Sequence, residues 1–167
     1  SHWVDEKFRK TGAVKSDIFG IGNEKPVMLY VGRISDEKGI FDLPYVYERV
    51  KEEFPDIRLV IAGKGPEEER LKEQLPDAKF LGWVEHNTLP DVYSAADLLI
   101  MPSRFDTFGN VIVEAFACGC PVVSYSTKGP RDIIENEKSG YLVNTKEKMA
   151  ECVISHLKKG KEMTAMK

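Results

Sequence analysis

Two carboxylates lie eight positions apart in residues 101–123, Asp106 in a loop and Glu114 within an apolar stretch. From Asn110 onward the apolar residues follow the pattern of a buried helix, which places Glu114 inside that helix. An unpaired charge in this setting destabilises a fold by several kcal/mol, so Glu114 is expected to have a partner. This pattern suits a nucleotide sugar. Its anionic middle can be held by the backbone amides at the helix N-terminus, and the hydroxyls at its two ends can donate to the carboxylates. The alternative is a structural pair between Glu114 and a cation such as Arg131.

Two basic residues follow the first predicted strand, in the sequence GRISDEKG. Arg33 offers a planar fork of donors and Lys38 a compact charge, and together they suit a diphosphate. Gly32 leaves room around them. The alternative is a solvated loop in which Asp36 and Glu37 form local ion pairs with these cations.

A second glycine-containing loop, GKGPEE, follows the second predicted strand. Gly63 and Gly65 allow a tight turn, and Pro66 starts a helix. The loop lacks the GxGxxG pattern, so a simple turn and an approach to phosphate are equally open interpretations. The missing pattern also argues against a different class of function, a dinucleotide-binding module for NAD chemistry.

Apolar runs of strand length alternate with helical patterns along most of the chain. The runs are continuously apolar, which is typical of strands that are buried on both faces. The sequence therefore predicts an α/β fold, a Rossmann-like doubly wound parallel sheet of about six strands. We expect an irregular lead-in at 1–25, the domain at 26–160 and a tail at 161–167. Strands are predicted at 26–32, 57–63, 79–82, 97–102, 121–125 and 140–143, and helices at 40–54, 66–75, 89–96, 110–118, 130–136 and 146–158.

The composition of the 167 residues, with 31% charged and 42% hydrophobic side chains, is that of a globular protein. No apolar run approaches the ~20 residues that a membrane span needs. The formal net charge is −3 and the basic residues are scattered, so a nucleic-acid partner is not indicated. Cys118, Cys120 and Cys152 lack metal-ligand spacing, which fits a reducing cytoplasm. Cys118 and Cys120 flank Gly119, the expected helix stop, and are expected to have packing roles. We expect a cytoplasmic location, no metal site and no membrane contact within this chain.

The chain carries a series of motifs in a characteristic order: GRISDEKG, AGKGP, FLGWV, YSAADLLIMPS and FDTFGNVIVEAFACGCPVVSYSTKGPRDIIENEKSGYLV. Their order and spacing resemble the C-terminal donor-binding domain of the family 4 (group 1) retaining glycosyltransferases, which have the GT-B fold. The resemblance covers nearly the whole chain, and VDEKF near its start looks like the interdomain junction of that family. The two acids of the family fall on Asp106 and Glu114. A glutamate is commoner at the first position, so Asp106 is a conservative departure that shortens the side chain by one methylene.

The resemblance implies roles for individual residues. Arg33 and Lys38 would bind the diphosphate and stabilise the leaving group. Asp106 would contact hydroxyls of the donor sugar, and it completes the implied catalytic set with the two cations. Glu114 would accept the ribose hydroxyls. The other implied donor-binding positions are Gly32, Val84 beside the base, and the backbone amides of Phe108, Gly109, Asn110 and Val111 beside sugar or phosphate oxygens.

The resemblance further implies the donor-binding half of a retaining hexosyltransferase in glycan or glycolipid synthesis, with no cofactor and no metal. The family's N-terminal acceptor-binding domain does not fit into 167 residues, so we expect an excised half-enzyme. The sequences DTFGN and KGPRDII are most similar to those of mannosyl- or glucosyl-transferring members, which favours GDP-mannose as the donor. The alternative is a nucleotide-sugar-binding subunit that acts with a separate partner chain.

Overall fold

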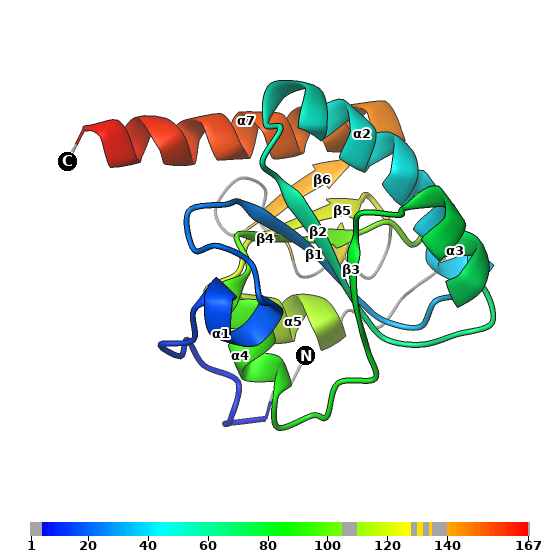
Figure 1. Ribbon diagram of the computed structural model, residues 1–167, viewed down its shortest axis with the longest axis horizontal. Helices are drawn as coiled ribbons and strands as arrows, with labels where there is room; N and C mark the ends of the chain where they lie inside the picture. Colours follow the sequence, from blue (N-terminus) through cyan, green and yellow to red (C-terminus); the bar gives the residue numbers. More distant parts are fainter. Residues whose placement is uncertain (1–4, 105–109, 128–129, 132–133, 135–139, 167) are drawn as a thin grey trace.

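The computed structural model describes residues 5–104, 110–127, 130–131, 134 and 140–166. In this part of the chain six strands form one parallel sheet in the order β3-β2-β1-β4-β5-β6, with helices on both faces (Figure 1). The Rossmann-like doubly wound fold is confirmed, and each strand lies within one residue of its predicted bounds. The strands are β1 (Val27–Val31), β2 (Arg58–Ala62), β3 (Lys79–Gly82), β4 (Leu98–Met101), β5 (Val122–Tyr125) and β6 (Gly140–Val143).

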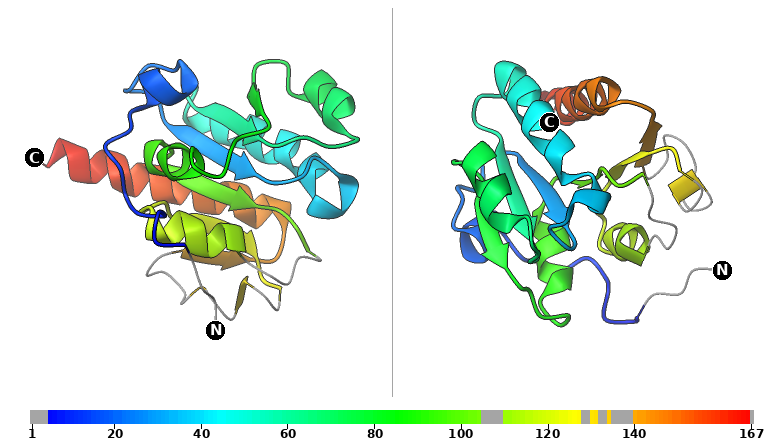
Figure 2. Two further views of the ribbon diagram at one scale, coloured as in Figure 1. Left: turned by 90° about the horizontal axis from the view of Figure 1, so that it is seen from below. Right: turned by 90° about the vertical axis from the view of Figure 1, so that its right-hand side faces the viewer.

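The central strand β1 is fully buried because a separate hydrophobic core covers each face of the sheet. Met28 and Tyr30 belong to one core, and the alternate residues Val27, Leu29 and Val31 belong to the other. This alternation follows from the period of two along a strand. Figure 2 shows the two helical layers. The first core is covered by α2 (Leu43–Glu53), α3 (Glu68–Gln74) and α7 (Lys146–Ala165), and the second by α1 (Lys15–Phe19), α4 (Leu89–Ala95) and α5 (Asn110–Ala117).

The strand order changes direction at the centre of the sheet. From β1 the chain proceeds outward through β2 to β3, and it then returns to β4 and proceeds outward to β6. The strands run in register, with Val31 opposite Ala62 and Leu29 opposite Leu99, so their carboxyl ends meet at one edge. In doubly wound sheets ligands bind at this edge, next to the point where the order reverses.

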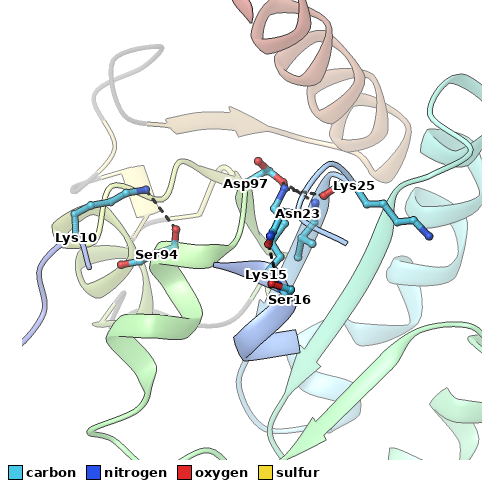
Figure 3. A network of polar contacts seen from close by, with 8 residues as sticks. Lys10, Lys15, Ser16, Asn23, Lys25, Ser94 and Asp97 are labelled. Atoms are coloured by element: carbon cyan, nitrogen blue, oxygen red, sulfur yellow. Dashed lines mark hydrogen bonds and ion pairs between the residues drawn. The ribbon is translucent and has the colours of Figure 1, made fainter. Parts of the chain in front are cut away.

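The segment before β1 is more ordered than the irregular lead-in that the sequence predicts. It contains the short helix α1, and Phe8 and Phe19 are buried in the core beneath α4 and α5. The Nζ atom of Lys15 lies 2.7 Å from Asp97 Oδ2 (Figure 3). The same oxygen accepts the backbone N–H of Val27 at 2.7 Å. Apart from α1 the described part of this segment is irregular. Its packing is not visible in the sequence, because long-range contacts leave no local periodicity.

The last helix also extends beyond its expected end. The sequence predicts a helix at 146–158 and a tail at 161–167, whereas α7 continues to Ala165. The hydroxyl of Thr145 caps its start by accepting the N–H of Lys148 at 3.0 Å. No proline interrupts residues 159–165, so the helix propagates past the core. Among the described helices, none has the length and apolar character needed to cross a membrane.

Two other helix predictions differ in detail. The helix expected at 40–54 begins as the short 3-10 turn η2 (Ile40–Asp42), which follows another turn, η1 (Asp36–Lys38), and leads directly into α2. A proline in the first turn of α2 suits this start, because that position needs no hydrogen-bonded N–H. The helix expected at 130–136 lies mostly outside the described residues.

Candidate functional site

The loops that follow β1 and β2 lie against each other at the carboxyl edge of the sheet. The N–H of Gly32 donates to Ala62 O at 3.0 Å, and the N–H of Ile34 donates to Lys64 O at 2.9 Å. Gly63 has φ +144°, and a Cβ at this position would overlap the carbonyl oxygen of Gly32. Glycine is therefore required for the contact, and the close approach of two loops explains part of the GKGPEE motif.

A pocket of about 670 Å³ opens beside these loops. Arg33 lies at its β1 end, and Trp83 and Val84 follow β3 at the other end. Trp83 is 73% exposed, although tryptophan usually buries most of its ring in the core. The pocket therefore joins a cation, a run of small loop residues and an open aromatic surface. Its lining consists of Val31, Gly32, Arg33, Ala62, Gly63, Lys64, Gly65, Pro66, Trp83, Val84 and Leu89.

A smaller pocket of about 50 Å³ lies between the loops that follow β1 and β4. Lys38 lines it together with Ser103 and Val111, and it shares Val31 and Gly32 with the larger pocket. Arg33 and Lys38 thus belong to adjoining pockets that meet at Gly32. The structure brings together the two cations that the GRISDEKG motif predicts to act on one ligand.

The cations have different surroundings. Arg33 is exposed, and within the described residues no carboxylate lies within 4.0 Å of its guanidinium, so the local ion pair with Asp36 or Glu37 is not formed there. Lys38 is half-buried. The pKa of Glu37 lies below its ordinary value, chiefly because its own backbone N–H donates to the carboxylate, with the charges of Arg33 and Lys38 adding to the effect.

Glu114 is half-buried on α5, in its second turn. Its Oε1 accepts the hydroxyl of Tyr93, which lies on α4, at 2.9 Å. Burial raises the pKa of Glu114 above its ordinary value, while the hydrogen bond from Tyr93 and the charge of His86 act in the opposite direction. In the part of the chain that the structure describes, no Lys or Arg lies within ion-pair distance of Glu114, and Arg131 is exposed. The structural pair with Arg131 is therefore not observed.

The remaining expected site residues divide into two groups. Asp106, Phe108 and Gly109 lie outside the described residues. Asn110 is the exposed first residue of α5, and Val111 follows it in the wall of the smaller pocket. The start of α5 therefore faces the same region as Lys38.

Three residues near the site were not assigned a role by the sequence. Trp83 stands in the FLGWV motif, and its position at a strand end was the available signal. Lys64 lies between the two glycines of the second loop and lines the larger pocket. Tyr93 lies in YSAADLLIMPS, but its contact with Glu114 depends on the packing of α4 against α5. No local sequence pattern predicts that contact.

Cys118 and Cys120 have the packing roles that the sequence predicts. Cys118 and Cys120 are buried, Cys152 is half-buried, and all three are free thiols. Burial raises the pKa of Cys120 to about 12, so this thiol stays protonated near neutral pH.

Comparisons with known proteins agree with this geometry. The family model described as "Glycosyl transferases group 1" matches residues 14–167. A "GDP-mannose-dependent alpha-mannosyltransferase" from Corynebacterium glutamicum is 38% identical over 120 residues, which are 72% of this chain and 28% of that protein. A "2-deoxystreptamine N-acetyl-D-glucosaminyltransferase" from Streptomyces fradiae is 33% identical over 132 residues, 74% of this chain and 31% of that protein. The chain thus spans less than a third of either relative.

Solved structures show the same fold. The C-terminal domain of a group 1 glycosyl transferase (LpcC) from Francisella tularensis has a TM-score of 0.82 at 20% identity, covering 95% of this chain and 90% of that one. Sucrose-phosphate synthase from Thermosynechococcus elongatus has a TM-score of 0.79 at 26% identity, covering 91% of this chain and 41% of that one. Anabaena Alr3699/HepE, in complex with UDP and glucose, has a TM-score of 0.80 at 23% identity, with coverages of 93% and 46%. The chain belongs to the group 1 glycosyl transferases, and its sheet is the Rossmann-like half-domain of these GT-B structures.

Proposed function

We propose that the chain is the donor-binding half of a retaining hexosyltransferase and that it holds a nucleoside-diphosphate sugar at the carboxyl edge of the sheet. The observation that carries the proposal is the position of Arg33 and Lys38 in two pockets that adjoin at Gly32. A diphosphate at Gly32 would receive the guanidinium fork from one side and the ammonium from the other. The nucleoside would extend along the larger pocket and the sugar toward the start of α5.

The proposed chemistry needs positive charge at the leaving group. When the bond between the anomeric carbon and the phosphate oxygen breaks, negative charge builds on the departing diphosphate. Arg33, Lys38 and the N-terminal amides of α5 would stabilise this charge as it develops. Because these groups supply the charge, we propose that no divalent cation is required.

The nucleoside end of the site has two recognition elements. The nucleobase lies against Val84 and the open ring of Trp83, since aromatic side chains stack with bases in a sequence-tolerant way. Glu114 accepts the ribose hydroxyls, and Asp106 accepts those of the hexose. We propose GDP-mannose as the donor, a choice supported by the mannosyltransferase relatives from Corynebacterium glutamicum and Mycolicibacterium smegmatis, at 38% and 32% identity.

The acceptor is proposed to bind to a domain outside these 167 residues, because the matched part makes up only 28% and 31% of the two relatives' own length. Calorimetric titration of the chain with GDP, UDP, ADP, their hexose conjugates and NAD tests the donor assignment. We expect micromolar to millimolar binding of GDP and GDP-mannose without added metal, roughly the affinity of a site that no second domain closes. Absence of binding by all nucleoside diphosphates would refute the proposal, and binding of NAD alone would favour a dehydrogenase module.

Retention is a separate part of the proposal and needs the complete enzyme. The product formed from an α-linked donor should carry an α-linked sugar, which the anomeric coupling constants in an NMR spectrum report directly. A β-linked product would show inversion. It would contradict retention but not the proposed donor site.

A further inference from the structure

The hydroxyl of Tyr93 is the hydrogen-bond partner of the Glu114 carboxylate within the described residues. It donates to Oε1 at 2.9 Å, and the tyrosine side chain itself is completely buried. Oε2 accepts no hydrogen bond from any residue in that part of the chain. The carboxylate therefore has one oxygen tied to the interior and one oxygen open to a ligand.

The ring of Tyr93 also packs against the segment before α1. The centroid of the Phe8 ring lies 6.1 Å from that of Tyr93, and Phe8 is buried. Next to Tyr93, the hydroxyl of Ser94 accepts the N–H of Thr11 at 2.9 Å, and the carbonyl of Ser94 accepts Lys10 Nζ at 3.3 Å (Figure 3). These contacts fix both the ring and the backbone of α4 at this point, so the hydroxyl of Tyr93 has a defined position.

The pair also lies next to the walls of both pockets. Leu89, which lines the larger pocket, precedes Tyr93 by four residues on α4, and Val111, which lines the smaller pocket, precedes Glu114 by three residues on α5. Residues three or four apart share a face of a helix. The Tyr93–Glu114 pair therefore lies beneath the two residues through which these helices reach the pockets.

We propose that Tyr93 is a positioning residue for donor binding: it orients the Glu114 carboxylate so that Oε2 faces the ribose hydroxyls. The proposal rests on the proposed function, because it takes the ligand of Glu114 to be a ribose. Without the tyrosine hydroxyl the carboxylate could rotate, and the ribose would have to order it on binding. A prearranged acceptor avoids that loss of conformational freedom.

The contact has a second effect, on the charge of Glu114. Burial raises the pKa of Glu114, and the hydrogen bond from Tyr93 lowers it, so loss of the hydroxyl should raise the pKa further. Among the described residues, the titratable groups that face Glu114 from neighbouring segments are Tyr93 on α4, His86 before α4 and Cys118 after α5. Tyr93 is thus expected to keep the acceptor ionised to a lower pH.

The test uses Tyr93→Phe, which removes only the hydroxyl, and two ligands, GDP and 2′,3′-dideoxy-GDP. We expect the variant to bind GDP roughly three- to tenfold more weakly than the wild type and to bind the dideoxy ligand equally well. As the pH falls and Glu114 becomes protonated, the ratio of the two dissociation constants should approach one. In the variant this should happen at a higher pH than in the wild type. The two ligands differ only in the ribose hydroxyls, so this ratio isolates the ribose contact.

Tyr47→Phe is the matched control. Tyr47 is also fully buried, and its hydroxyl donates to Ile57 O at 3.3 Å in the core on the other face of the sheet. This variant should lose comparable stability and keep the wild-type ratio. If Tyr93→Phe also keeps the wild-type ratio, or weakens both ligands equally, the positioning role is refuted.

A measurement without ligand separates this inference from the proposed function. The side-chain carboxyl carbon of Glu114, followed by 13C NMR as a function of pH, should titrate at a higher pH in Tyr93→Phe than in the wild type. If the titration is unchanged, the positioning role is wrong whatever the chain binds. If the titration shifts but the wild type binds GDP and its dideoxy analogue equally, the ribose assignment fails, and with it the role of Tyr93 in donor binding.

Discussion

The carbonyl oxygen of Pro102 occupies the space that a side chain on Gly39 would fill. Gly39 has φ +71°, and a Cβ added there would overlap this oxygen. Gly39 directly follows Lys38, and Pro102 directly follows β4. The contact therefore sets the loop that carries one proposed diphosphate ligand against the chain that leaves the neighbouring strand.

Gly39→Ala should be strongly destabilising. The left-handed backbone costs an alanine about 1–2 kcal/mol, and the overlap with Pro102 adds a further cost of about 1–3 kcal/mol. Gly20→Ala is the matched control, because Gly20 has φ +66° and open space around its Cβ position. Urea unfolding of both variants measures the difference. Equal losses would mean that the loop moves away from Pro102 without cost.

The strands could be predicted because burial on both faces makes each of them continuously apolar, as in VMLYV of β1. The segment before β1 could not, because Phe8 and Phe19 become ordered only when α4 and α5 are in place. The same reason explains the extra length of α7, since helix propagation past Lys158 depends on weak preferences that no cap or proline marks.

The site shows a similar division. Arg33 and Lys38 could be placed at one edge of the sheet, because both follow a predicted parallel strand whose carboxyl end must face that edge. The partner of Glu114 could not be predicted, since Tyr93 lies 21 residues earlier in the chain and meets Glu114 through helix packing. Arg131 was a candidate partner because of its opposite charge, but the sequence does not show whether the two side chains lie close together.

Arg33→Ala and Lys38→Ala should each weaken the binding of GDP by about tenfold or more. A charge-assisted hydrogen bond contributes about 1.5–3 kcal/mol, and both residues are proposed to contact the diphosphate. Calorimetry with GDP and with guanosine separates the two ends of the ligand, because guanosine lacks the diphosphate and its affinity should change little. Lys159→Ala, at an exposed position on α7, controls for the loss of one positive charge. Equal losses for GDP and guanosine would contradict a local role at the diphosphate.

Trp83 should report nucleotide binding through its fluorescence. Trp83 is 73% exposed and lines the larger pocket, so a stacked base should quench the emission. Stacking contributes about 1–3 kcal/mol per base, so Trp83→Ala should weaken GDP at least fivefold, and Trp83→Phe should retain most of the affinity. Inorganic pyrophosphate lacks a base and should bind all three proteins alike. A loss of pyrophosphate binding in Trp83→Ala would show that the tryptophan supports the loops and does not contact the base.

Glu114→Gln should raise the stability of the ligand-free chain near neutral pH. Burial holds the pKa of Glu114 above its value of 4.5 in the unfolded chain, so ionisation opposes folding. A group whose pKa is raised by folding contributes stability that is fully present below its pKa in the unfolded chain. This stability is lost as the pH rises through its pKa in the folded chain. The wild type should therefore melt below Glu114→Gln near neutral pH, and the difference should vanish on acidification below the unfolded pKa. A lower melting temperature of Glu114→Gln at every pH would contradict this assignment of the charge.

The two carboxylates are expected to act on different parts of one ligand. Glu114 is proposed to accept from the ribose, which GDP and GDP-mannose share, so Glu114→Gln should weaken both ligands by a similar factor. Asp106 is proposed to contact the hexose, so Asp106→Asn should leave GDP binding unchanged and reduce only the additional affinity of GDP-mannose. A ribose hydroxyl that loses its charged acceptor costs about 1–3 kcal/mol, which corresponds to roughly five- to 150-fold in affinity.

The binding of GDP and GDP-mannose to each of the two variants gives four dissociation constants, which decide between these roles. The wild type is the reference, and unchanged circular dichroism shows that the variants are folded. In the complete enzyme Asp106→Asn should also lower the rate of transfer more than it weakens the donor, because the hexose hydroxyls hold the anomeric carbon in place while the bond to phosphate breaks. If both variants lose the same factor on both ligands, the division between ribose and hexose is wrong. If Glu114→Gln binds both ligands as the wild type does, Glu114 serves the packing of α4 against α5 and not the donor.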